Sequence, residues 1–177
     1  NGNDGTAGNT GADAIHASLS GKFENVSVAG YYGRYKADAT AALTQSQYKI
    51  AASTSVSGFN LGLEYAANGN DGGETMLDGS DTAGSEISIG ALELSQEGDA
   101  SAVLFSASTS VGEKGTARVR FAQSDNNADS QDITVVRVNY DYQMSANFRA
   151  YVEYTSNDDE GSATKASDYV VGAQYSF

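Results

Sequence analysis

Apolar and polar residues alternate along most of this chain, which is the pattern of a β-strand with two different faces. The alternation is clearest at the end of the sequence, where apolar side chains occupy every second position: Tyr169, Val171, Ala173, Tyr175 and Phe177. It recurs over 14–23, 26–36, 47–56, 61–65, 101–111, 116–123, 136–142 and 149–155. The sequence therefore predicts about nine strands, each presenting an apolar face and a polar face.

The connections between these strands alternate between short and long. Short turns are predicted at Glu24-Asn25, 57–60, 112–115 and 145–147, and longer polar loops at 37–44, 69–100, 124–132 and 156–167. Outer-membrane barrels have this asymmetry, with short turns on the periplasmic side and long loops outside. Much of the negative charge falls in the long loops, in water.

Composition excludes several classes of function. The chain of 177 residues has no Cys, which rules out disulfides, a Cys-ligated zinc site and a thiol nucleophile. A net charge of −13 argues against nucleic acid as a partner. No run approaches 18 apolar residues, so a transmembrane helix is not expected. No basic and then apolar segment opens the chain, so any signal peptide is expected to have been removed.

A soluble β-sandwich would also alternate, but it would be expected to carry Pro in its loops, and this chain has none. Tyrosines gather near the predicted strand ends, as in the aromatic girdles of membrane barrels. They are Tyr31, Tyr32, Tyr35, Tyr65, Tyr140, Tyr142, Tyr154, Tyr169 and Tyr175. A membrane barrel is the better interpretation.

The final strand, ending on Phe177, resembles the terminal assembly signal of Gram-negative outer-membrane proteins. The segment RVNYDYQMSANFRAYVEY is similar to the penultimate hairpin of general porins of the gammaproteobacterial type. The resemblance is firm over 101–177 and weaker before it. It implies a 16-stranded barrel, a homotrimer, contact with outer-membrane lipid and lipopolysaccharide, and delivery by the barrel assembly machinery.

Strand parity suggests an incomplete barrel. Strand direction reverses at every turn and loop, so the first and the ninth predicted strands run parallel. Single-chain bacterial barrels instead have an even number of strands, which lets the first and the last pair antiparallel. We therefore expect one partial barrel domain over 1–177, the last nine strands of sixteen, completed by an N-terminal segment not in this chain. Residues 1–12 and 69–100 would be external loops. The alternative is an added strand within 85–95, giving ten strands in a small closed barrel.

Charged residues on the polar faces are candidates for lining a pore, because a charge facing lipid would cost about 2–4 kcal/mol near the midplane. Opposing charges across a pore order water and admit polar solutes. The candidates are Lys22, Lys49, Glu64, Arg118, Arg120, Arg137, Asp141, Arg149 and Glu153. The four arginines lie on consecutive strands and could form a basic patch. The alternative is that they pair with the carboxylates only to satisfy a polar interior.

Two further features suggest chemistry only weakly. His16 is the only histidine, and no nucleophile motif accompanies it, so it is interpreted as a solvated lumen residue. The segment GNDGG at 69–73 faintly resembles a calcium-binding repeat but occurs once, so it is interpreted as a solvated loop. Binding of divalent ions that bridge the protein surface to lipopolysaccharide is left as an alternative.

The sequence thus predicts a passive diffusion channel for ions and small hydrophilic solutes in the outer membrane, without enzymatic activity or a cofactor. The main rival is a small closed barrel of 8–10 strands with a structural or adhesive role. A secreted soluble binding domain would require the Tyr, Val and Phe rows to be buried.

Overall fold

The computed structural model describes residues 12–37, 44–71, 88–89, 92–93, 98–126, 132–160 and 165–176. The described part is all β, and no helix in it is long and apolar enough to cross a membrane. Nine long strands form the body of the molecule: β1 (Ala12–Phe23), β2 (Val26–Ala37), β3 (Thr44–Val56), β4 (Phe59–Asn68), β7 (Ala100–Val111), β8 (Gly115–Asn126), β9 (Ile133–Ser145), β10 (Phe148–Asp159) and β11 (Ala166–Tyr175).

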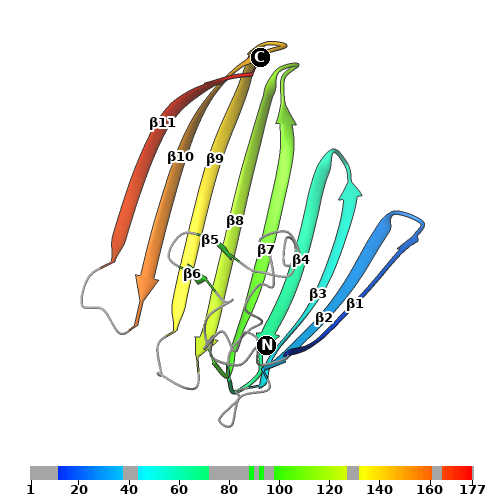
Figure 1. Cartoon of the computed structure of the whole chain (residues 1–177). Helices are drawn as coiled ribbons and strands as arrows, with labels where there is room; N and C mark the ends of the chain where they lie inside the picture. The colour runs from blue at the N-terminus through cyan, green and yellow to red at the C-terminus, as the bar shows by residue number, and fades with distance from the viewer. Residues whose placement is uncertain are drawn as a thin grey trace, which may run out of the picture.

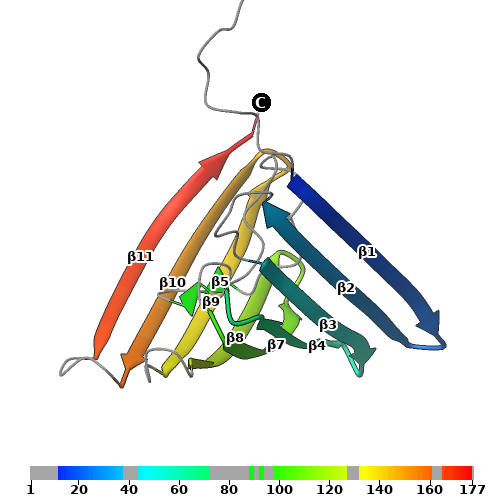
Figure 2. The same ribbon diagram turned by 60° about the horizontal axis from the view of Figure 1, so that its bottom comes forward.

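These strands make one antiparallel sheet in the order β1-β2-β3-β4-β7-β8-β9-β10-β11, so every strand pairs with its neighbours in sequence. The sheet is strongly curved, with β1 and β11 at its two edges (Figures 1 and 2). No other described strand pairs with either edge. The prediction of nine antiparallel strands is confirmed.

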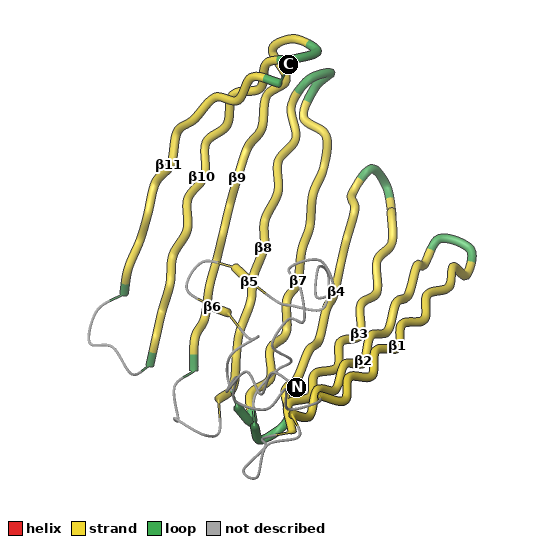
Figure 3. Tube along the Cα trace, viewed as in Figure 1, coloured by secondary structure: helices red, strands yellow, loops and turns green. Residues whose placement is uncertain are grey.

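Tight turns join the strands at one end of the sheet and longer connections join them at the other (Figure 3). The turn between β3 and β4 is Ser57-Gly58, with φ of 51° and 83°. Two successive left-handed residues form the type of hairpin turn that matches strand twist, and Gly adopts this conformation without a steric penalty. The four predicted turn positions are confirmed.

The strands extend further toward the long loops than the sequence predicts. Residues 124–126 continue β8 and residues 156–159 continue β10, although both stretches were expected to be loop. Asn157 and Asp158 pair with Val135 and Thr134 of β9, so the hydrogen-bonded ladder continues beyond the apolar segment. Polar side chains are compatible with this ladder because it depends on backbone groups.

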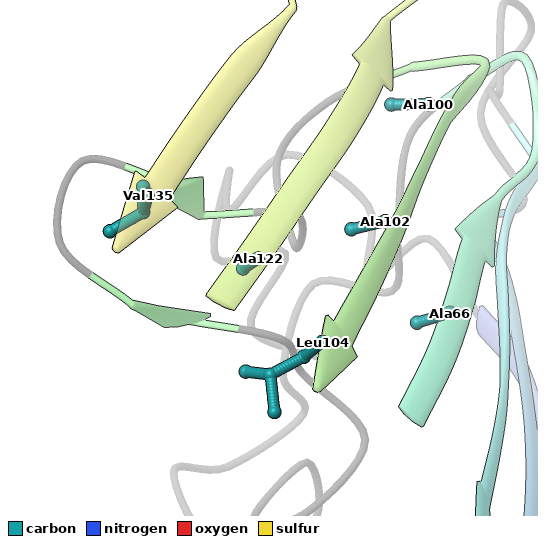
Figure 4. Close-up of a cluster of buried hydrophobic side chains, with 6 residues drawn as sticks. All are labelled: Ala66, Ala100, Ala102, Leu104, Ala122 and Val135. Carbon is teal, nitrogen blue, oxygen red and sulfur yellow. The ribbon is translucent and has the colours of Figure 1, made fainter. Parts of the chain in front are cut away.

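The two faces of the sheet are opposite in character. Large hydrophobic side chains lie exposed on the convex face, including Leu19 and Val171, which are 81% and 84% exposed; of the exposed large hydrophobic residues described, only Val170 is on the other face. The buried cluster lies on the concave face instead (Figure 4): Ala66, Ala100, Ala102, Leu104, Ala122 and Val135. Buried Gln47, Asn139 and Thr155 also lie there. A water-soluble protein would instead bury most of its large hydrophobic side chains and expose its polar ones.

Aromatic side chains form two rows on the convex face. Nearer the long loops, the rings of Tyr154 and Tyr169 are 4.8 Å apart, and those of Tyr48 and Tyr65 are 5.9 Å apart. At the turn end, Phe148 pairs with Tyr175. The expected girdle is thus present, but the register places positions Tyr31 and Tyr35 on the other face. Tyr31 pairs with Ser18 and Lys49 on the concave face, because the Tyr31-Tyr32 doublet can place only one ring outward.

A short hairpin lies within the connection between β4 and β7. Strands β5 (Ser88–Ile89) and β6 (Leu92–Glu93) pair with each other and not with the main sheet. The hairpin lies on the concave side of the sheet, where β5 is labelled in Figure 2. Strand β6 contacts β8 and β9. The alternative of a tenth barrel strand within 85–95 is therefore wrong. The assignment of 69–100 as an external loop stays a prediction, although this part of it lies over the wall.

The inverted faces give a direct stability prediction at two adjacent residues of β3. Ile50 is exposed on the convex face, and Ala51 lies on the concave face opposite Glu64. Ile50→Lys should lower the free energy of unfolding from lipid vesicles by about 2–4 kcal/mol, because the ammonium would enter hydrocarbon. Ala51→Lys should change it by less than about 1 kcal/mol, because its charge would face water and Glu64. Denaturant titration in vesicles measures both, and equal losses would contradict the assignment of the faces.

Candidate functional site

The concave face carries most of the positive charge of the chain. Six of the ten Lys and Arg residues lie on it: Lys22, Lys49, Arg118, Arg120, Arg137 and Arg149. Glu64, Asp141, Glu153 and Asp168 share this face within the sheet, and Asp159 lies at its loop end. The structure thus brings all nine residues predicted to line a pore onto one wall.

Three of the cations on the described wall have carboxylate partners on a neighbouring strand, and the two shorter pairs are those of Lys49 and Arg149. Lys49 Nζ of β3 is 2.6 Å from Glu64 Oε2 of β4. Arg149 Nη1 of β10 is 3.2 Å from Asp141 Oδ1 of β9, and its Nη2 donates to Gln174 Oε1 of β11 at 2.8 Å. Each ion pair joins residues that are diagonal neighbours across the ladder. Such pairs neutralise charges of the wall locally. This is what the alternative interpretation expects, in which the charged residues pair only to satisfy a polar interior.

Arg137 makes the third and longest of these ion pairs. Its Nε lies 3.4 Å from Glu153 Oε1 and donates to Thr155 Oγ1 at 3.1 Å. Beside it, Asn139 Nδ2 donates to Asp141 Oδ2 at 2.8 Å, which orients that carboxylate between an amide and Arg149. A network of ion pairs and hydrogen bonds therefore runs across β9 and β10.

Arg118 and Arg120 differ from the other wall arginines. Within the described residues neither guanidinium has an ion pair or a hydrogen bond, and the buried Nε of Arg120 has no partner. Lys22 likewise has no ion pair in the described residues, but it lies exposed beside the β1–β2 turn. The expected patch of four arginines is therefore divided: Arg149 is neutralised, Arg137 is partly neutralised, and the positive charge of Arg118 and Arg120 is in excess.

An aromatic ring supports the end of this wall near the turns. Tyr151 pairs with Gly172 across β10 and β11, and a side chain at Gly172 would overlap the Tyr151 ring. The Arg149 guanidinium carbon lies 5.6 Å from the centre of the same ring. A glycine opposite an aromatic residue is a stable combination in sheets, because the ring covers the exposed backbone. Tyr151 thus helps to hold Arg149 in place.

Small side chains leave the opposite half of the wall open. A hollow of about 670 Å³ lies on the concave face over β1 to β7 and is lined mainly by small and hydroxylated residues, including Ser20, Ser53, Gly62, Ser106 and Ser108. A Cβ at Gly62 would lie 2.6 Å from Ser106 Oγ, so this hydroxyl would have to move to admit a side chain. The small lining residues leave this part of the wall open.

His16 and the GNDGG segment are the two weaker candidates for chemistry, and their described residues lie away from the arginines of the wall. His16 Nδ1 lies 3.0 Å from the Tyr31 hydroxyl on the concave face, with the two rings edge to face. Asp71, in the GNDGG segment, accepts a hydrogen bond from the Thr44 backbone N–H, and the rest of that segment lies partly outside the described residues. No group of three potential metal ligands occurs in the described part of the chain.

The predicted assembly signal lies on the edge strand β11. Tyr169, Val171, Ala173 and Tyr175 share its convex face, while Phe177 lies outside the described residues. Four contributors to the wall were not singled out from the sequence: Thr155, Tyr151, Asn139 and Gln174. The alternation already placed them on the polar faces, and only the register showed which charged residues they contact.

An antiparallel sheet with an apolar convex face and a charged concave wall defines the class of outer-membrane barrel proteins. Within that class, the chain belongs to the Gram-negative porin family, whose model matches residues 1–162. It is accordingly an outer-membrane protein. A comparison with curated protein sequences finds no match.

Solved structures of outer-membrane proteins share the fold. A loop L8 deletion mutant of OmpT, an outer membrane protein of Vibrio cholerae, is 14% identical, with a TM-score of 0.61; the match covers 93% of this chain and 53% of that one. Outer-membrane expressed OmpT of the same organism is 15% identical, with a TM-score of 0.60, over 94% and 57% of the two chains. OmpT folded in vitro, in a trimer form, is 15% identical, with a TM-score of 0.58, over 93% and 56%. The chain spans just over half the length of these structures.

The contact between Tyr151 and Gly172 can be tested by adding a single methyl group. Gly172→Ala should lower the free energy of unfolding by about 1–3 kcal/mol, because the new Cβ would displace the Tyr151 ring. Gly30→Ala is the matched control, since a Cβ at that strand glycine meets nothing within 4 Å. It should be neutral or stabilising by up to about 1 kcal/mol. Denaturant unfolding in vesicles compares the two variants, and equal effects would show that the ring does not pack on Gly172.

Proposed function

We propose that this chain forms part of the wall of a water-filled channel in the outer membrane, through which ions and small hydrophilic solutes diffuse passively. The observation that carries the proposal is the concave face, where charged and hydroxylated side chains line a wall whose opposite face is apolar. Membership of the Gram-negative porin family supports it. The function needs no covalent chemistry and no cofactor, because selection depends on pore width and on the charge of the lining.

The barrel is closed by additional strands that pair with β1 and β11. Both edges of the nine-stranded sheet expose backbone N–H and C=O groups, and unpaired backbone groups are not tolerated in hydrocarbon. The ends of the sheet cannot pair with each other in the usual antiparallel way, because nine alternating strands make β1 and β11 parallel. This geometry disfavours the rival reading of a small closed barrel with a structural or adhesive role.

The lumen is narrowed on its β8–β9 side. The β5–β6 hairpin lies over these two strands, and the side chains of Ala122 and Val135 beneath this region are fully buried. Solutes therefore pass along the remaining wall, over the hollow lined by Ser53 and Ser106. This arrangement favours small hydrophilic solutes over large ones.

The proposed assembly is a homotrimer in contact with lipid and lipopolysaccharide, and it is inserted by the barrel assembly machinery. The structural similarity to an OmpT described in a trimer form supports the oligomeric state. The exposed row of Tyr169, Val171, Ala173 and Tyr175 supplies an apolar strand edge suited to recognition by an assembly factor.

Single-channel recording in planar bilayers tests this function, with protein extracted from outer membranes in mild detergent. We expect stepwise conductance that increases with salt concentration, in groups of three if the trimer inserts as a unit. Heat-denatured protein from the same preparation is the control and should be silent. Correctly inserted protein that conducts no ions would contradict the proposed channel.

A further inference from the structure

The excess positive charge of the wall is concentrated where β7, β8 and β9 run side by side. Arg120 of β8 pairs directly with Arg137 of β9, and Arg118 is the next residue of β8 on the same face. On the other side, β7 places Ser106 opposite Arg120 and Ser108 opposite Arg118. One patch thus combines three guanidinium groups and two hydroxyl groups.

This arrangement is electrostatically unfavourable without a counter-charge. Like charges directly opposite each other in a sheet are destabilising. Arg137 has Glu153 at 3.4 Å, but within the described residues the Arg118 and Arg120 side chains have no carboxylate partner. The Nε of Arg120 is moreover buried and makes no hydrogen bond. A buried donor on a charged group costs more free energy to leave unpaired than an ordinary one.

The rest of the wall shows that local pairing was available. Lys49 and Arg149 each have a carboxylate on the adjacent strand, at 2.6 and 3.2 Å. At the positions that would neutralise Arg118 and Arg120 on β7, the chain has Ser108 and Ser106 instead. Hydroxyls can donate to an anion but cannot neutralise a cation. The patch is therefore suited to a ligand that supplies the negative charge.

We infer that Arg118, Arg120 and Arg137, with Ser106 and Ser108, form a binding site for a small oxyanion carrying about two negative charges, of the class of inorganic phosphate. Planar guanidinium groups donate two parallel hydrogen bonds to such oxyanions, which makes them the preferred phosphate ligands. The adjoining hollow of about 670 Å³, which Ser106 and Ser108 also line, gives an ion access. The inference rests on the proposed channel for its role, since the site would retain anions in transit, but the binding itself can be measured separately.

Arginine modification in the folded protein tests the binding without requiring conduction. Phenylglyoxal is applied with and without inorganic phosphate at constant ionic strength, and the modified arginines are identified by mass spectrometry. Phosphate should slow modification of Arg118 and Arg120 several-fold. Arg149, held by Asp141 and Gln174, and Arg34, on the convex face, should be unaffected. Uniform slowing, or none, would overturn the site.

Conductance measurements then separate the site from the channel. Phosphate should reduce the chloride current, and the double variant Arg118→Gln, Arg120→Gln should raise the half-blocking concentration about tenfold, as expected when a charge-assisted hydrogen bond is lost. Arg149→Gln is the matched control and should shift it less than about twofold. Unchanged block in the double variant would overturn the site. Silent bilayers despite specific phosphate protection would leave the site standing and remove the channel.

Discussion

The fold depends on one constraint: every backbone polar group at membrane depth must find a hydrogen bond within the protein. Here one continuous antiparallel ladder pairs the seven inner strands on both sides, while β1 and β11 are each paired on one side only among the described strands. With the backbone satisfied, side chains of alternating polarity are free to face two different solvents. The exposed row containing Leu19, Ile50 and Val171 faces lipid, and the wall containing Lys49 and Arg137 faces water. The convex face, which would promote aggregation in a soluble protein, is the contact surface with the bilayer.

Charge is distributed unequally between the wall and the loops. The chain has 23 Asp and Glu residues against 10 Lys and Arg, yet the wall within the sheet has six cations and four carboxylates, leaving aside Asp159 at the loop end. Most carboxylates lie in the connections or near the strand ends that lead to them, where water solvates them at low cost. In the proposed channel, a solute entering from the loop side would therefore meet a negative region first and a positive wall afterwards. The positive excess is not spread evenly, because Lys49 and Arg149 are paired while Arg118 and Arg120 are not.

The sequence alone predicted the strands, their faces and the tight turns, because a period of two and turn residues such as Ser57-Gly58 are local signals. It placed all nine charged candidates on the polar faces for the same reason. It did not predict which charges pair, since Arg149 reaches Asp141 through a diagonal contact that depends on register. It also missed the continuation of β8 and β10 into polar stretches, where backbone pairing outweighs composition. The position of the β5–β6 hairpin over the wall depends on long-range packing that no local pattern encodes.

Adjacent residues of one strand face lipid and water in turn, and this alternation can be tested directly. The chain has no cysteine, so single cysteines can be placed one at a time at positions 48 to 53 of β3 without background labelling. Protein inserted in vesicles is treated with a charged maleimide that reacts only in water. We predict labelling at 49, 51 and 53 and protection at 48, 50 and 52, with the pattern reversed for a thiol reagent dissolved in the lipid. Labelling of both sets by the charged reagent would contradict this arrangement of the two faces. Labelling at 48, 50 and 52 with protection at 49, 51 and 53 would contradict it as well.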